Sequence, residues 1–524
     1  MSIGLPSMAY ADGIRKYKQT EFGGYNHTLA AQDGELWDMQ NMSSDLYPLL
    51  SPRKPRYLLR TLTAPNGFFA KDGLYWVDGT GFYADGTKRG TVTSGRKQFA
   101  AIGAHIVILP DKAYYNRDTG VFGSMEKSWS GTASFKDGTY AGEQAAGNTI
   151  YASGVTWASY FNVGDAVTIS GSAKAENNKT AVIREIEGNY LRFYENCFTN
   201  AESEKLTLAR TVPDLDYICE NENRLWGCKG DTIYCSKLGD IFNWNVYDGL
   251  ATDSFAVDVG SAGDFTGCCS FLGYPCFFKE ENIYKVYGDK PSNFQVMGSA
   301  SLGVEAGSHG SLAIAGEVLF YLARTGIVAY SGGIPQSVAA PFGTDRYRNA
   351  VAGSDGTKYY VSMEDMSGKH TLFVYDTRTN LWHKEDEREI VGFGWNSELY
   401  FLDGTGKLWL NGNAREVPAG ATQEAAVESI AEFGDFVEGN PNRKGTAKIQ
   451  VRMELDAGAS VTISLQFDTD GVWRDVSTLA ATAKRSFYLP IIPRRSDHFR
   501  IKIKGTGGWR LYSLVRENYS GSEV

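Results

Sequence analysis

The sequence predicts an all-β protein built on a β-propeller of about seven blades, with an inserted small β-barrel and a C-terminal β-sandwich. Three observations lead to this fold class: a composition rich in aromatic residues and glycine, a hairpin pattern that recurs along the chain, and alternating apolar residues in the stretches outside the repeats. The predicted propeller comprises residues 61–130 and 211–412.

The composition favours short strands joined by tight turns. Among 524 residues the chain has 59 glycines, 30 tyrosines, 27 phenylalanines and 11 tryptophans. Aromatic side chains suit the half-buried surface of a pleated sheet, and glycine supplies the backbone conformations that tight hairpin turns require. This mixture predicts many β-hairpins.

A hairpin of two apolar strands around a glycine-containing turn recurs along the chain. The three clearest copies occupy residues 74–83, 319–328 and 399–409, and weaker copies occupy 105–115, 224–234, 276–284 and 358–375. After residue 220 neighbouring copies lie roughly 35–50 residues apart, which is the period of a propeller blade. Residues 375–382, which read Tyr-Asp-Thr-Arg-Thr-Asn-Leu-Trp, also resemble a kelch-type strand. Seven hairpins predict about seven blades.

The stretches outside the repeats predict two accessory domains. Residues 131–210 contain strands joined by glycine turns, which indicates a small inserted β-barrel or an open sandwich; it is either a projecting contact module or a passive spacer. Residues 413–430 are rich in alanine and glutamate and are expected to form a linker. Apolar residues alternate within 431–524, which predicts a β-sandwich. Residues 1–60 are expected to form an extended N-terminal arm.

Charge and hydropathy exclude several classes of partner. The net charge is −9 with both signs interspersed, whereas tight nucleic-acid binding needs a basic patch. We find no apolar run of about 18 residues and therefore expect no membrane span. The first residues lack the pattern of a secretory signal, so we expect synthesis in a cytosol. The seven cysteines have no CxxC spacing and are expected to be reduced thiols.

No catalytic, cofactor-binding or metal-binding residues are predicted. The sequence lacks HExxH, GxSxG, P-loop and Rossmann motifs, and its six histidines have no metal-ligand spacing. A glycosidase on a propeller would need paired carboxylates. The candidates adjoin predicted hairpin turns, where acids usually satisfy local backbone donors; they are Asp111, Asp231, Glu280, Glu281 and Asp403. We therefore expect the protein not to be an enzyme.

A hairpin in the predicted sandwich raises one alternative role. Its turn, Asp470-Gly471-Val472-Trp473, resembles a turn found in carbohydrate-binding sandwiches, although it is first of all a hairpin signal. Solvent-exposed aromatic platforms around Trp473 or Trp509 would favour binding of carbohydrate.

Several segments resemble virion proteins of tailed bacteriophages, in particular the tail nozzle or tail-stabilising proteins of short-tailed phages. The resemblance spans about residues 20–410 and is strongest in segments 22–26, 33–42, 47–53, 236–244 and 278–288. The inserted module and the terminal sandwich are not part of that pattern.

The resemblance implies a structural protein of the virion tail, assembled in the bacterial host cytoplasm. Its implied form is a homo-oligomeric ring, expected to be hexameric, that acts as a nozzle or hub at the distal tail through contacts with neighbouring tail proteins. The ring would form part of the channel for DNA ejection. The alternative is a receptor- or carbohydrate-binding tail protein, an adhesin, that grips a host surface glycan.

Overall fold

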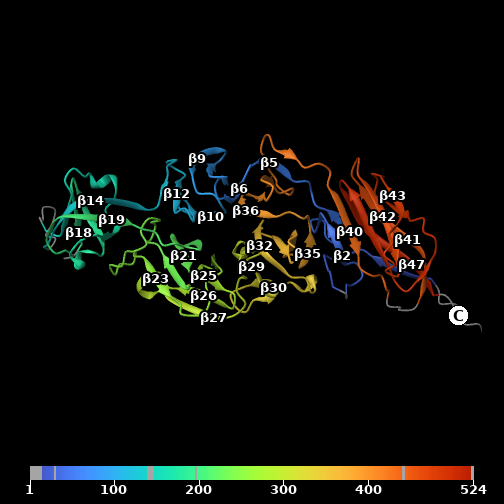
Figure 1. Cartoon of the computed structure of the whole chain (residues 1–524). Helices are drawn as coiled ribbons and strands as arrows, with labels where there is room; N and C mark the ends of the chain where they lie inside the picture. The colour runs from blue at the N-terminus through green and yellow to red at the C-terminus, as the bar shows by residue number, and fades with distance from the viewer. Residues whose placement is uncertain (1–13, 29–30, 139–146, 195–197, 439–442, 521–524) are drawn as a thin grey trace, which may run out of the picture. The chain divides into compact units, whose positions relative to one another are not determined.

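The computed structural model describes residues 14–28, 31–138, 147–194, 198–438 and 443–520. Within these ranges the chain folds into 47 strands, and its only helical segments are five three-residue 3-10 turns (Figure 1). These turns are η1 (Trp157–Ser159), η2 (Ala175–Asn177), η3 (Pro291–Asn293), η4 (His309–Ser311) and η5 (Ala340–Phe342). The all-β prediction is confirmed. A helix with the length and apolarity to cross a membrane does not occur in the described ranges.

The chain divides into two compact units. Unit 1 comprises residues 1–62 and 310–524, and unit 2 comprises residues 63–309. The predicted propeller therefore has segments in both units, and the predicted insertion belongs to unit 2.

Unit 2 contains four antiparallel four-stranded sheets in its described part, each built in sequence order. The first is β6 (Pro65–Ala70), β7 (Leu74–Asp78), β8 (Gly81–Ala84) and β9 (Thr87–Thr91). The second is β10 (Gln98–Ile102), β11 (His105–Leu109), β12 (Ala113–Asn116) and β13 (Phe122–Ser124). The third is β20 (Tyr217–Asn221), β21 (Arg224–Lys229), β22 (Thr232–Cys235) and β23 (Phe255–Asp258). The fourth is β24 (Gly267–Phe271), β25 (Tyr274–Lys279), β26 (Asn282–Tyr287) and β27 (Gln295–Ala300).

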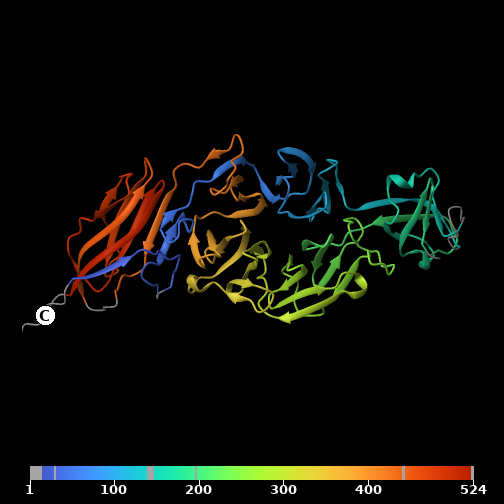
Figure 2. The same cartoon turned by 180° about the vertical axis from the view of Figure 1, so that it is seen from behind.

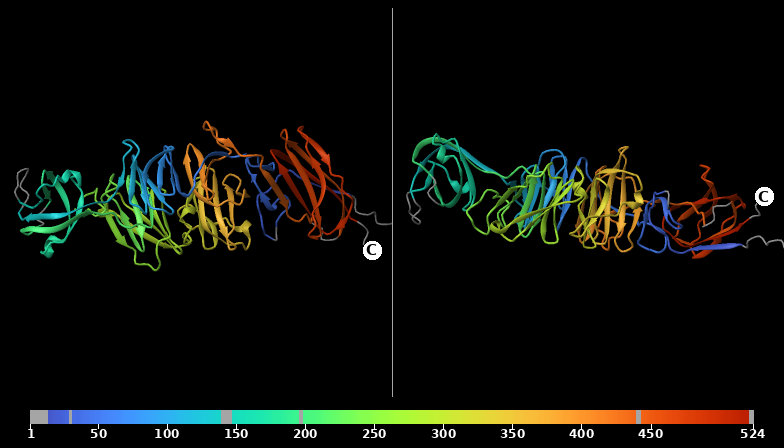
Figure 3. Two further views of the ribbon diagram at one scale, coloured as in Figure 1. Left: turned by 45° about the horizontal axis from the view of Figure 1, so that its top comes forward. Right: turned by 90° about the horizontal axis from the view of Figure 1, so that it is seen from below.

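A six-stranded closed barrel lies between the second and third of these sheets in the sequence. Its strands are β14 (Lys127–Lys136), β15 (Thr149–Tyr151), β16 (Ala166–Ser170), β17 (Thr180–Glu187), β18 (Tyr190–Phe193) and β19 (Ala201–Arg210). Around the barrel they follow the order β14-β15-β18-β17-β16-β19, and β19 closes it against β14. Figure 3 shows the barrel, coloured teal, from two further sides.

Unit 1 contains three more sheets of the same kind in its described part. They are β28 (Ala313–Ala315), β29 (Val318–Ala323), β30 (Gly326–Tyr330) and β31 (Gln336–Ser337); β32 (Tyr347–Ser354), β33 (Lys358–Asp365), β34 (His370–Asp376) and β35 (Leu381–Lys384); and β36 (Ile390–Asn396), β37 (Glu398–Asp403) and β38 (Lys407–Leu410). The last sheet takes its fourth strand from near the N-terminus, β5 (Tyr57–Thr61), and β39 (Thr422–Gln423) adds to its edge.

Unit 1 also contains two five-stranded sheets that share one buried core. One sheet is β1 (Arg15–Gln19), β47 (Trp509–Ser520), β41 (Lys444–Leu455), β44 (Arg485–Tyr488) and β45 (Arg495–Ser496). The other is β2 (Leu36–Gln40), β40 (Glu428–Phe433), β46 (Phe499–Thr506), β42 (Ser460–Phe467) and β43 (Arg474–Leu479). A short ladder of β3 (Met42–Ser43) and β4 (Ser51–Pro52) follows β2 in the N-terminal segment. Alternating apolar residues of β41, β42 and β46 fill the shared core.

The N-terminal segment does not stand apart from the rest of unit 1. Strands β1, β2 and β5 each complete a sheet made otherwise of C-terminal strands, as Figure 2 shows for the blue and red ribbons of β1 and β47. The segment also contributes buried side chains to the core of unit 1; they are Phe22, Tyr25, Leu36, Met39, Met42 and Leu50. The stretch expected to be an extended arm therefore pairs with strands from the other end of the chain.

All seven hairpins found in the sequence are present as the second and third strands of the seven sheets. Their turns use glycine where the backbone needs a positive φ. Gly406, between β37 and β38, has a φ of +87°, and a Cβ atom there would lie 2.2 Å from the carbonyl oxygen of Leu62. Only glycine fits this turn, because both the conformation and the close approach exclude a side chain.

Candidate functional site

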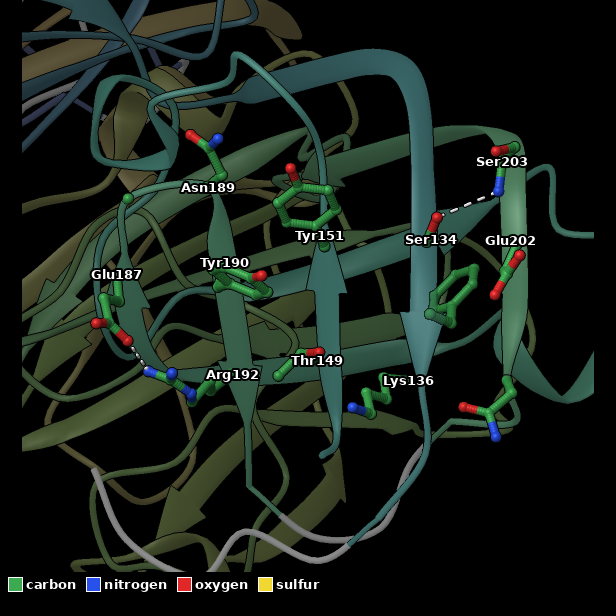
Figure 4. Close-up of a pocket in the computed structure, with 13 residues that line it drawn as sticks. Ser134, Lys136, Thr149, Tyr151, Glu187, Asn189, Tyr190, Arg192, Glu202 and Ser203 are labelled. Atoms are coloured by element: carbon green, nitrogen blue, oxygen red, sulfur yellow. Dashed lines mark hydrogen bonds and ion pairs between the residues drawn. The ribbon is translucent and has the colours of Figure 1, made fainter. Parts of the chain in front are cut away.

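A large hollow lies on the outer face of the barrel, and we call it the barrel groove. It has a volume of about 1140 Å³ and is lined by residues of β14, β15, β17, β18 and β19 (Figure 4). Two cross-strand rows form its floor, because residues that face one another across an antiparallel ladder point to the same side of the sheet. The first row is Ser134, Tyr151, Tyr190 and Glu187, and the second is Lys136, Thr149, Arg192 and Glu185.

The aromatic part of the groove is a pair of tyrosines. Tyr151 and Tyr190 face one another across β15 and β18, with ring centroids 4.8 Å apart and planes tilted by 39°. Tyr190 is 42% exposed. The turn that precedes Tyr190 is fixed from the barrel interior, where the indole nitrogen of the fully buried Trp157 donates to the carbonyl oxygen of Asn189 at 2.8 Å. Tyr151 is half-buried, so the pair is a partly exposed platform on a rigid support.

The charged part of the groove centres on a buried arginine. Arg192, whose side chain is 8% exposed, pairs with Glu187 at 2.6 Å (Figure 4) and with Glu185 at 3.1 Å. Burial alone would lower the pKa of Arg192, but the two glutamates outweigh burial and raise its pKa above the usual value. The side chain of Glu187 is 62% exposed, so its carboxylate remains open to solvent and to a ligand.

The other end of the groove is polar. Lys136, Asn200, Glu202 and Ser203 line it, and the backbone amide of Ser203 donates to the hydroxyl of Ser134 at 3.2 Å. The groove thus combines an aromatic platform with carboxylate, amide, ammonium and hydroxyl groups. This arrangement can hold a ligand by stacking and by hydrogen bonds in both directions.

The carboxylates considered for a glycosidase all lie at turns between second and third strands. Asp111, Asp231, Glu280 and Glu281 occupy such turns in unit 2, and Asp403 occupies one in unit 1.

The carboxylate of Asp403 is fully engaged in hydrogen bonds and an ion pair at its own turn. Its carboxylate accepts hydrogen bonds from the backbone amides of Thr405 and Lys407, both at 3.0 Å, and from the indole of Trp409 at 2.8 Å. It also pairs with Arg388 at 3.1 Å. Asp403 is buried and has the contacts of a structural turn acid.

Asp111 is held in a similar way. It pairs with the ammonium of Lys97 at 2.6 Å and accepts the backbone amide of Thr93 at 2.5 Å. Burial alone would raise its pKa, but these two partners lower the pKa of Asp111 below its usual range. The carboxylate is ionised at neutral pH and is not poised to donate a proton.

One group among the described residues has the composition of a cation site. Ligand atoms of Asp468, Asp497 and His498 lie within 4.8 Å of one another. Both ring nitrogens of His498 are already engaged, Nδ1 with Asp497 at 2.5 Å and Nε2 with the hydroxyl of Thr469 at 2.6 Å. Asp468 also pairs with Arg443 at 3.4 Å. The group is a closed set of mutual contacts, and we assign no metal to it.

The two tryptophans considered as carbohydrate platforms are not open platforms. Trp509 is 1% exposed, and its indole nitrogen donates to the hydroxyl of Ser429 at 2.9 Å. Trp473 is half-buried, and the ammonium of Lys502 lies 4.0 Å from its ring centroid. Six cysteines are described and all are free; burial raises the pKa values of Cys235 and Cys276 to about 12. The seventh, Cys197, lies outside the described residues.

Comparisons with known proteins concern the fold alone. No protein-family model and no curated protein matches the sequence. Among solved structures, the WD40 repeats of RRP9 align over 71% of this chain and 99% of their own, with 7% identity and a TM-score of 0.34. The β-propeller domain of the Trilobed protease from Pyrococcus furiosus aligns over 71% and 98%, with 10% identity and a TM-score of 0.29. An exo-beta-1,3-galactanase from Phanerochaete chrysosporium aligns over 57% and 94%, with 9% identity and a TM-score of 0.23. Similarities this low carry no argument about function.

Proposed function

We propose that the protein is a structural component of a bacteriophage tail that acts through protein–protein contacts. In this proposal the seven repeated antiparallel sheets are the blades of one propeller, and copies of the chain form a nozzle or hub ring at the distal tail. The sequence resemblance motivates the role. The observation that carries it is the repeated sheet, a rigid unit that offers many surface turns to neighbouring proteins.

The way the last sheet is completed supports a closed ring of blades. Strand β5 supplies the fourth strand beside β38, and the chain then runs directly into β6, the first strand of the first sheet. A strand of this kind joins the beginning and the end of the repeats within one sheet.

The turn carboxylates support a scaffold rather than a catalyst. Asp403 and Asp111 are bound to the backbone and to cations of their own turns, so neither is available as a general acid. The net charge of −9 suits a channel through which DNA passes, since phosphates would find few basic partners.

Particle composition tests this proposal directly. Tailed particles purified by density gradient from a lysate that expresses the chain would be analysed by mass spectrometry and imaged with a gold-labelled antibody. We expect the chain in the particles, in several copies, with the label at the distal tail. Absence from purified particles, or a label on the capsid alone, would contradict the proposal.

The second candidate is a receptor- or carbohydrate-binding tail protein. The tyrosine pair of the barrel groove, of which Tyr190 is exposed, favours it, whereas Trp473 and Trp509 do not. In this case the ring of chains would still be the support, and the barrel of each chain would make the contact with the host.

A further inference from the structure

The barrel groove has the chemistry of a saccharide site. Sugars present apolar C–H faces and a rim of hydroxyl groups, so their sites combine aromatic rings with hydrogen-bonding side chains. Tyr151 and Tyr190 provide two adjacent rings, and Tyr190 is 42% exposed. The rims of the groove provide carboxylates and amides from Glu187, Asn189 and Glu202 (Figure 4).

The size of the groove favours a chain of sugars over a single one. Pockets for drug-sized ligands have volumes of about 300–1,000 Å³. The barrel groove, at about 1140 Å³, lies above that range, and its polar groups extend from Glu187 on β17 to Glu202 on β19. Several sugar residues can therefore contact it at once.

The charges that line the groove are balanced, which gives an anionic ligand no excess of positive charge to bind. Arg192 and Lys136 contribute two positive charges, Glu187 and Glu202 contribute two negative charges, and Glu185 is a further partner of Arg192. The charge of Arg192 is shared between two glutamates, so it is a poor partner for an incoming phosphate or carboxylate. A nucleic acid could also stack on tyrosines, but its backbone needs basic side chains. The geometry points to a neutral ligand.

The groove is also preformed, which lowers the entropic cost of binding. The tyrosine pair lies on strands whose inner faces are buried in the barrel core, through Ile150 on β15 and Leu191 on β18. The indole of Trp157 fixes the turn before Tyr190. Binding then requires little rearrangement of the barrel.

We propose that the barrel groove binds a neutral oligosaccharide, stacked on Tyr151 and Tyr190 and hydrogen-bonded to Glu187 and the neighbouring amides. This inference extends the second candidate function, but it does not depend on the tail assignment. If the barrel binds saccharide but the protein is absent from particles, only the tail role is refuted. If the protein is present in tails but its groove binds no saccharide, only this inference is refuted.

The test uses the full-length chain on an array of neutral oligosaccharides of two to six residues. Acidic oligosaccharides and a single-stranded hexanucleotide serve as comparators. We expect at least one neutral oligosaccharide to bind, with the affinity confirmed by isothermal titration calorimetry. Tyr190→Ala should weaken that binding about tenfold or more, because it removes the exposed ring of the platform. Binding of acidic oligosaccharides or the hexanucleotide alone, or of nothing at all, would overturn the proposal.

Matched variants separate loss of the site from loss of the fold. Tyr160→Ala removes an equally exposed tyrosine (38%) from the barrel outside the groove and should leave affinity unchanged. Tyr190→Phe should retain most of the affinity, because it keeps the ring. Glu187→Gln should weaken binding of the neutral ligand about fivefold, since a carboxylate accepts stronger hydrogen bonds from hydroxyl groups than an amide does. Equal affinity of Tyr190→Ala and Tyr160→Ala would contradict the proposal.

Discussion

Arg56 of unit 1 and Arg192 of the barrel in unit 2 each lie between two carboxylates. Arg56, 3% exposed, contacts Glu385 and pairs with Asp386 at 2.6 Å; the side chains of both acids are 11% exposed. Arg192, 8% exposed, pairs with Glu187 and Glu185, whose side chains are 62% and 28% exposed. The arginines are alike in burial, whereas the carboxylates differ.

The difference shows how the same chemistry can serve either folding or binding. Around Arg56, the further contacts of Arg53 with Glu424 and of Arg388 with Asp386 extend the ion pairs into a buried network. That network holds the segment that leads into β5, the strand that completes the last sheet. Around Arg192 the glutamates remain partly hydrated, so they can exchange water for a ligand. We therefore assign the first group to stability and the second to recognition.

The largest expected effect follows from breaking the buried network. Arg56→Met leaves Glu385 and Asp386 short of a cation in a buried site, and we expect a loss of about 3–5 kcal/mol in the free energy of unfolding. Denaturant unfolding measures this loss. A change below about 1 kcal/mol would mean that Arg53 and Arg388 neutralise the two acids without Arg56.

Acidification should destabilise unit 1 more than the barrel, and this is the second-largest effect that we expect. Burial, reinforced by nearby Lys358, lowers the pKa of His383 in unit 1 to about 4. The neutral form is favoured by folding, so its stabilisation is complete above the ordinary pKa of about 6.5 and is lost as the pH falls towards 4. Across that window the cost is at most about 1.4 kcal/mol per pH unit. The barrel strands, residues 127–210, contain no histidine.

Hydrogen exchange at pH 7 and pH 5 measures this difference. We expect the opening of β33–β35 to increase more between pH 7 and pH 5 than the opening of the barrel strands does. In the His383→Gln variant this increase in β33–β35 should be smaller. An equal pH effect in that variant would exclude His383 as the cause.

The matching substitution in the barrel, Arg192→Met, should lower the free energy of unfolding by less than Arg56→Met does. Arg192→Met leaves two glutamates that can turn towards water, and we expect a loss of about 1 kcal/mol. The same denaturant measurement applies. A loss as large as that of Arg56→Met would show that the groove is a sealed structural site.

The smallest expected effect belongs to an exposed pair. Lys16, whose side chain is 67% exposed, lies 2.8 Å from Glu517 across β1 and β47. Because solvent screens this pair, Lys16→Met should change the free energy of unfolding by less than about 1 kcal/mol. The variant calibrates the two buried arginines, and a larger loss would show that β1 depends on this contact.

Local patterns predicted the hairpins, but they could not predict which distant strands meet. The run Leu74–Asp78 and the turn at Gly79 contain a complete hairpin, so sequence alone was sufficient there. The pairing of β2 with β40 joins short segments from opposite ends of the chain, and nothing local in Leu36–Gln40 specifies its partner. Long-range pairing depends on the packing of the whole core.

The candidate site escaped prediction for the same reason. Tyr151 and Tyr190 are ordinary strand tyrosines in the sequence, and only the register between β15 and β18 makes them a platform. Trp509, by contrast, was considered for a platform and is buried. The alternation of polar and apolar residues in 190–193 could have indicated that Tyr190 points outward. It could not have indicated that Tyr151 is its neighbour on the next strand.

Hydrogen exchange of the full-length protein with and without a bound neutral oligosaccharide tests most directly the contrast between the buried ion pairs around Arg56 and the hydrated glutamates around Arg192. We expect slower exchange in residues 134–136, 149–151 and 187–192, and unchanged exchange around Arg56. Protection confined to the strands around Trp473, or slower exchange around Arg56 with none in the groove, would contradict it.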